Sequence, residues 1–143
     1  MNRINWGRVV LGGMLAAAVL MVFATASTVL IAGRQGLRTS MHALQPSTRG
    51  GLAPLFFILA FLFLGILMTW WYAVIRSLFG PGPKAAAIAG FAMWLTVIAF
   101  TLKSVAVGEP VPLPEGPIST ILYLLMMIAS TTAGAWVYKE QQR

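Results

Sequence analysis

The residue best placed to do chemistry inside an apolar stretch of this chain is Lys103. It is the only charged side chain within a long hydrophobic run, and such a residue inside a membrane is a functional hypothesis by default. Its ammonium could contact a substrate anion or a lipid phosphate. The competing interpretation is that the aliphatic stem carries the ammonium out to the membrane interface, since the run ends nearby at Val107. The position of Lys103 near the end of the run favours this second interpretation.

A second group of candidate residues gathers between the first two long apolar runs. If residues 35–45 form a helix, Arg34, Arg38 and His42 follow one another at four-residue steps. They adjoin an apolar stripe of Leu37, Met41 and Leu44. This is the pattern of a short interfacial helix on a lipid surface. An irregular polar loop is an equal alternative. The predicted contacts with lipid headgroups or a partner are Arg34, Arg38, His42 and Arg49.

Aromatic residues near the ends of the apolar runs form a third group. Rings that are partly apolar and carry an N–H or O–H prefer the headgroup level of a membrane, which predicts an interfacial belt. A cofactor-binding aromatic box is the weaker alternative. The predicted belt consists of Trp6, Trp70, Trp71, Tyr72, Trp136 and Tyr138.

The chain lacks the residues that most catalytic and metal-binding sites need. The chain has no cysteine and one histidine, which excludes disulfides, thiolate metal sites and paired imidazole ligands within one chain. Glu109 and Glu115 are six residues apart in a proline-rich segment that favours extended polyproline II structure, so we expect them to be solvated. The glycine-rich segment at residues 80–84 lacks the Walker spacing of a phosphate-binding loop, so we predict the turn of a helical hairpin. We therefore predict no catalytic residue, metal or cofactor.

The elements that must position these residues are apolar helices. Of the 143 residues, 59% are hydrophobic and 9% are charged, whereas a soluble domain carries about 25% charged residues. A helix needs about 20 apolar residues to cross a hydrocarbon core of about 30 Å, and runs of this length indicate helices rather than barrel strands. We predict an all-α fold, one four-helix transmembrane bundle formed by residues 1–143. The predicted spans are residues 9–33, 52–75, 85–107 and 117–138.

Small residues at four-residue spacing predict where these helices approach one another. They allow close backbone contact, which is the main source of packing energy in lipid. Packing within the bundle is favoured over a dedicated dimer face, and we expect hydroxyl side chains, including Thr25 and Thr28, to bond between helices. Methionines are expected to fill gaps in the core. The small-residue pairs are Gly12 with Ala16, Gly13 with Ala17, Ala86 with Gly90, and Ser130 with Gly134.

The net charge of +7 predicts an orientation rather than an acidic partner such as nucleic acid. Six cations lie on the side of the termini, and three or four lie on the other side, so the positive-inside rule favours N-in and C-in. The first span resembles a secretory signal with Ala24-Thr25-Ala26 at a cleavage-like site. Because the apolar run continues to Ile31, beyond the 7 to 15 residues typical of a signal, we expect it to be retained.

Three stretches resemble a group of small bacterial four-span proteins that are described only as uncharacterised membrane proteins. These stretches are INWGRVVLGG at residues 4–13, WWYAVIR at 70–76 with FGPGPK at 79–84, and AGAWVYKE at 133–140. The resemblance covers both ends and the middle of the chain. It implies four helices and a bacterial inner membrane, and it brings no activity and no catalytic residue.

The sequence favours a non-enzymatic inner-membrane protein, acting as an accessory, packing or lipid-interacting subunit. Its predicted partners are membrane lipids, with a homo-oligomer or a larger membrane complex as a further expectation. The first alternative is a small oligomeric transporter or channel in which Lys103 attracts an anion. The second is a membrane enzyme or quinone-binding protein with its site near Trp70, Trp71 and Tyr72.

Overall fold

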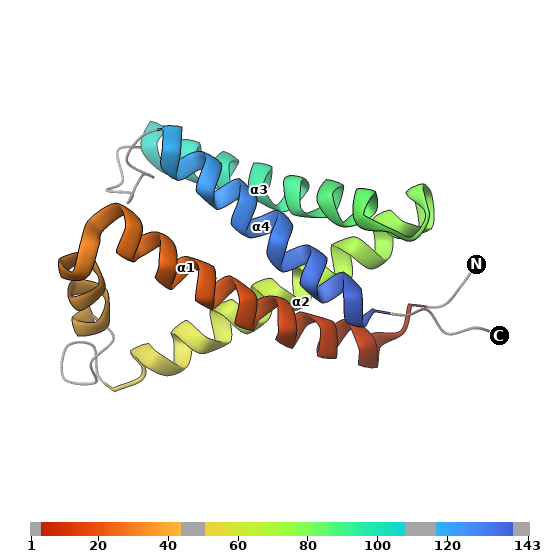
Figure 1. Ribbon diagram of the computed structural model, residues 1–143, viewed down its shortest axis with the longest axis horizontal. Coiled ribbons are helices and arrows are strands. Elements are labelled where there is room, and N and C mark those ends of the chain that lie inside the picture. Colours follow the sequence, from red (N-terminus) through yellow and green to blue (C-terminus); the bar gives the residue numbers. More distant parts are fainter. Residues whose placement is uncertain (1–3, 44–50, 108–116, 139–143) are drawn as a thin grey trace.

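The described part of the chain forms four helices, each antiparallel to the one before it (Figure 1). The computed structural model describes residues 4–43, 51–107 and 117–138. Each helix is long and apolar enough to cross a membrane, so the predicted all-α bundle of four transmembrane helices is confirmed. Arg49 and the three acidic residues lie outside the described residues. The helices are α1 (Trp6–Ala43), α2 (Ala53–Phe79), α3 (Pro83–Ala106) and α4 (Pro117–Val137).

Glycine and proline form the turn between α2 and α3. Gly80 follows the last residue of α2 with φ 79°, and its N–H donates to the Arg76 carbonyl at 2.9 Å. Gly82 has φ 144°, and only glycine adopts positive φ without steric cost. Pro83 is the first residue of α3, a position where its missing N–H has no helical partner to lose. The predicted helical hairpin is therefore confirmed.

α1 exceeds the length of one span because its backbone breaks at Gly33. The glycine has φ 65° and ψ −166°, a combination that is essentially restricted to glycine. The helix continues beyond it in a new direction, at one end of the bundle (Figure 1). We call residues 34–43 the kinked segment. The sequence left a helix and a loop as equal alternatives here, and the helix is present as far as Ala43.

The helices meet at the small residues that the sequence singled out. A Cβ added to Gly12 would lie 2.6 Å from the Gly134 carbonyl oxygen, and one added to Gly13 would lie 2.6 Å from the Ile66 Cα. A Cβ added to Gly90 of α3 would lie 2.7 Å from the Ile128 Cα of α4. These contacts bring α1 against α2 and α4, and α3 against α4. The prediction that the small residues serve packing within the bundle is confirmed.

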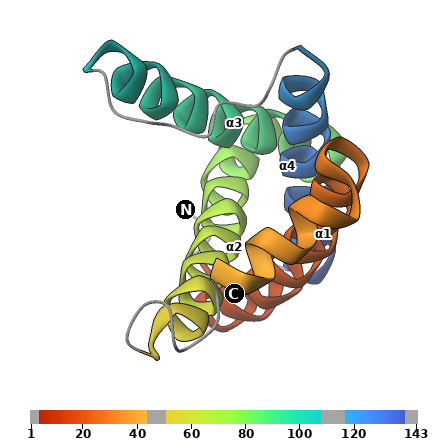
Figure 2. The same ribbon diagram turned by 90° about the vertical axis from the view of Figure 1, so that its left-hand side faces the viewer.

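The bundle is tightly packed at one end only. Among the described residues, every buried one lies in the part that contains the start of α1 and the end of α4, whereas no side chain described in the remainder is buried. Figure 2, viewed from the loosely packed end, shows the helices diverging toward the viewer. We call these parts the packed half and the open half. The packed half comprises residues 4–20, 65–93 and 126–138, and the open half comprises residues 21–43, 51–64, 94–107 and 117–125.

Candidate functional site

The kinked segment carries the cationic residues that the sequence singled out. Arg34, Arg38 and His42 are all exposed, and their four-residue steps place them along one side of the helix. On the neighbouring stripe, Leu37 is half-buried and Met41 is exposed. A helix with a cationic stripe beside an apolar one is suited to lie where headgroups meet acyl chains. The structure therefore brings three of the four predicted contact residues onto one surface.

Hydroxyl side chains flank the break that creates this segment. Thr25 donates to the Met21 carbonyl at 2.9 Å, and Thr28 donates to the Ala24 carbonyl at 2.8 Å. Beyond the break, Thr39 donates to the Gln35 carbonyl at 3.1 Å. The expected bonds to other helices are thus replaced by bonds within α1. Hydrogen bonds from a hydroxyl to the carbonyl four residues earlier often bend a helix. The bonds of Thr25 and Thr28 are therefore consistent with the change of direction that follows at Gly33.

Lys103 lies in the last turn of α3, at the same end of the bundle as the kinked segment (Figure 1). The Trp94 indole N–H joins α3 to α4 by donating to the Thr120 carbonyl at 3.3 Å. The last turns of α3 diverge from the other helices (Figure 2). The Lys103 side chain is exposed. Lys103, the predicted anion contact, therefore lies on a different helix from the kinked segment.

Two arginines contact the end of α4 at the opposite end of the bundle. Arg8 Nη1 donates to the Val137 carbonyl at 3.2 Å, and Arg76 Nη1 donates to the Tyr138 carbonyl at 3.5 Å. The last carbonyls of a helix lack partners within it and carry partial negative charge, so cations are favourable there. The Arg76 guanidinium also lies over the Tyr138 ring, 5.6 Å from its centroid. Sequence reasoning missed this arrangement, because it joins residues 129 and 62 positions apart.

The tryptophans of the predicted belt have two different environments. Trp6 and Trp136 are 62% and 87% exposed, near the beginning of α1 and the end of α4. Trp70 and Trp71 are half-buried, with their rings edge to face at 5.8 Å. The exposed pair has the placement that an interfacial ring requires, and the other pair contributes to the core.

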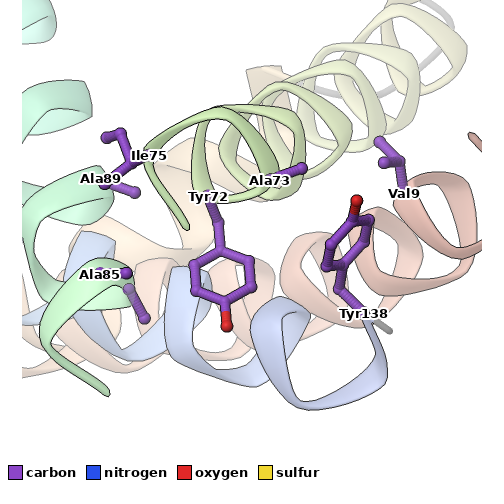
Figure 3. Packing of buried hydrophobic residues seen from close by; sticks show 8 residues of the cluster. Val9, Tyr72, Ala73, Ile75, Ala85, Ala89 and Tyr138 are labelled. Carbon is purple, nitrogen blue, oxygen red and sulfur yellow. The ribbon is translucent and has the colours of Figure 1, made fainter. Parts of the chain in front are cut away.

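The two tyrosines of the predicted belt are buried in the packed half. Their rings are perpendicular, with centroids 5.9 Å apart, and such edge-to-face pairs are favourable. Figure 3 shows Tyr72 extending from α2 and Tyr138 lying near Val9 of α1. Both belong to one cluster of buried apolar side chains that also includes Ala85 and Ala89 of α3. These rings therefore help to hold the four helices together.

Buried hydroxyls also occupy the packed half. Thr69 donates to the Gly65 carbonyl at 3.1 Å, and Thr131 donates to the Met127 carbonyl at 2.8 Å. The Ser130 hydroxyl has no hydrogen-bond partner within the described part of the chain. In that same part, no three side chains of the metal-binding types gather into one group.

Comparison with protein-family models, with curated proteins and with solved structures finds no match to this chain.

Proposed function

We propose that this protein is a non-enzymatic multi-pass subunit of a bacterial inner membrane, and that it contacts anionic lipid headgroups through the kinked segment. The observation that carries the proposal is the row of Arg34, Arg38 and His42. All three are exposed on the kinked segment, the part of α1 that changes direction after Gly33. Arginine presents a planar fork of donors that suits phosphate. The adjoining Leu37 and Met41 can enter the acyl boundary while the arginines stay among the phosphates.

The distribution of charge supports an orientation with both termini in the cytoplasm. Arg8, Arg76 and Lys84 lie in the packed half, which also contains the first and last described residues. This orientation would place the kinked segment at the outer leaflet. A reporter fused after Arg143 should be active in the cytoplasm, and activity only outside it would reverse the assignment.

Lipid retention measures the proposed headgroup contact. The protein is purified in mild detergent, mixed with phosphatidylglycerol or phosphatidylcholine, and its bound lipids are counted by native mass spectrometry. One arginine near an anionic surface contributes about 1 kcal/mol, so Arg38→Gln should weaken phosphatidylglycerol retention about fivefold. The Arg34→Gln/Arg38→Gln double variant should weaken it further. Phosphatidylcholine, which has no net charge, should be retained equally by all variants.

The matched control is Lys84→Gln. Lys84 is also an exposed cation, but it lies in the packed half, at the turn between α2 and α3. Its removal changes the net charge by the same amount as Arg38→Gln and should leave retention unchanged. Equal losses of phosphatidylglycerol for Arg38→Gln and Lys84→Gln would mean that retention depends only on the net charge of the protein. Unchanged retention in the double variant would refute the proposed function.

A further inference from the structure

Within the first three turns of α2, residues 55–60 are exposed on every side of the helix. The six consecutive residues from Leu55 to Ala60 are all exposed, although six residues pass around an α-helix more than once. Phe56 is the most exposed of their large side chains, at 63%. From Gly65 onward the same helix has a buried face that packs against α1 and α4. The beginning of α2 therefore has an apolar surface that no other described part of the chain covers.

The depth of this surface matches one leaflet of a membrane. Residues 53–64 are twelve residues of helix and rise about 18 Å, while half of the hydrocarbon core is about 15 Å thick. The open half of each other helix begins at a similar depth, after Leu20 in α1, after Met93 in α3 and before Met126 in α4. A helix from a partner would span both leaflets, whereas a lipid occupies only one. The extent of the open half thus favours a lipid.

The side chains of this surface also favour flexible chains over a helix. Close helix contacts in this protein occur at glycines such as Gly13 and Gly65, all of which lie in the packed half. The first turns of α2 lack such small residues except for Ala53 and Ala60, and consist mainly of leucine, isoleucine and phenylalanine. Bulky side chains keep a second backbone at a distance. Acyl chains can adapt to their uneven surface.

The charge at the open end distinguishes a lipid from a second copy of the chain. The kinked segment lies close to the start of α2 (Figures 1 and 2), and only residues 44–50 join the two. A second copy placed there would bring Arg34 and Arg38 near the same arginines of its neighbour. A phosphate at this level would instead be attracted to them.

We propose that the beginning of α2 and the kinked segment together bind a single anionic phospholipid, with its phosphate at Arg34 and Arg38 and its acyl chains along residues 53–64. This inference rests on the proposed headgroup contact and adds a defined binding place for the rest of the lipid. The kinked segment selects for charge, and the open face of α2 receives the apolar chains from the same leaflet.

A fluorescent label at the proposed acyl site provides the test. The chain has no cysteine, so Phe56→Cys gives one labelling position for bimane. The labelled protein is placed in nanodiscs of phosphatidylcholine, and phosphatidylglycerol with brominated acyl chains is added as the quencher. The matched control is Phe91→Cys, an exposed phenylalanine of α3 in the packed half. If Phe56→Cys fails to fold, Leu59→Cys on the same turns replaces it.

Phosphatidylglycerol should quench the label at position 56 at a mole fraction lower than at position 91 by more than about fivefold, which corresponds to more than about 1 kcal/mol of preference. Brominated phosphatidylcholine should quench both positions at equal mole fractions. In the Arg34→Gln/Arg38→Gln background, the preference for phosphatidylglycerol at position 56 should disappear.

Two results would overturn the inference. Equal quenching of both positions by phosphatidylglycerol would mean that α2 contacts only bulk lipid. If the arginine variants still lowered lipid retention, the proposed headgroup contact would stand without the acyl site. A label at position 56 that neither lipid quenches, in discs containing two chains, would mean that a second copy covers α2. Unchanged retention in the arginine variants would remove the proposed function and this inference together.

Discussion

Replacing Gly13 with alanine should push α1 away from α2 and weaken the bundle. The added Cβ would lie 2.6 Å from the Ile66 Cα and 2.8 Å from its backbone nitrogen. Because both atoms belong to the backbone of α2, no side-chain rotation can relieve the contact. Ordinary van der Waals contact begins at 3.4 Å, so the helices must separate locally by about 0.8 Å, and a gap of this size forfeits a quarter to a half of each neighbouring contact energy.

The expected loss is about 1–3 kcal/mol of unfolding free energy, the usual cost of overpacking a core. Alanine favours a helix over glycine by about 1 kcal/mol. That advantage largely cancels when the chain is unfolded with SDS, because the separated helices persist in the detergent. The steric cost is then the main difference between the variant and the parent protein.

The assay is an SDS titration of the protein in mild detergent, followed by the fluorescence of its tryptophans. The matched control is Gly7→Ala in the same helix, because a Cβ at Gly7 would meet only Asn5 Oδ1, at an ordinary 3.6 Å. Gly7→Ala should unfold at the midpoint of the parent, and Gly13→Ala at a lower SDS fraction. Identical midpoints for the two variants would refute the close approach of α1 to α2 at Gly13.

Two further substitutions test the opposite ends of the bundle. Arg76→Gln removes the donor to the Tyr138 carbonyl and the cation above its ring, so in the same titration it should cost about 1 kcal/mol, whereas Lys84→Gln should cost nothing measurable. Gly33→Ala places a Cβ in a conformation essentially limited to glycine, so it should redirect the kinked segment and lower phosphatidylglycerol retention, while Gly7→Ala should retain lipid normally.

The fold could be predicted from sequence because a membrane imposes strong constraints on a chain. Uninterrupted apolar runs of sufficient length can only be helices there, and α2, α3 and α4 begin within two residues of the predicted spans. The glycines and prolines at residues 80–83 predicted the turn for equally local reasons. α1 departs from its predicted span because it continues past the break at Gly33 as the kinked segment. The sequence shows that residue 33 is a glycine, but it does not show that this glycine adopts the conformation that breaks the helix.

The arrangement around the end of α4 could not be predicted in the same way. The positive-inside rule explains Arg8 and Arg76 fully as orientation signals, so the sequence offers no reason to seek a second role. Tyr138 follows the last apolar residue of α4 and has the pattern of an interfacial ring, yet it is buried beside Tyr72. The hydroxyls of α1 were likewise expected to reach other helices, although a carbonyl of their own helix is always within reach. Each of these outcomes depends on neighbours that are distant in the sequence.

The unequal packing of the two halves follows from where the small residues lie once the helices alternate in direction. They occur early in α1 and α3, at Gly12 and Gly90, halfway along α2, at Gly65, and late in α4, at Gly134. Antiparallel helices bring all four positions into the packed half of the bundle. Since lipid tails are as apolar as leucine, bulky side chains gain little from leaving lipid for one another, and only close backbone approach favours association. The chain therefore packs closely where small residues of different helices face one another, and it leaves the bulky first turns of α2 exposed. These exposed turns adjoin the arginines of the kinked segment, which supports the proposed site for a charged lipid at this end of the protein.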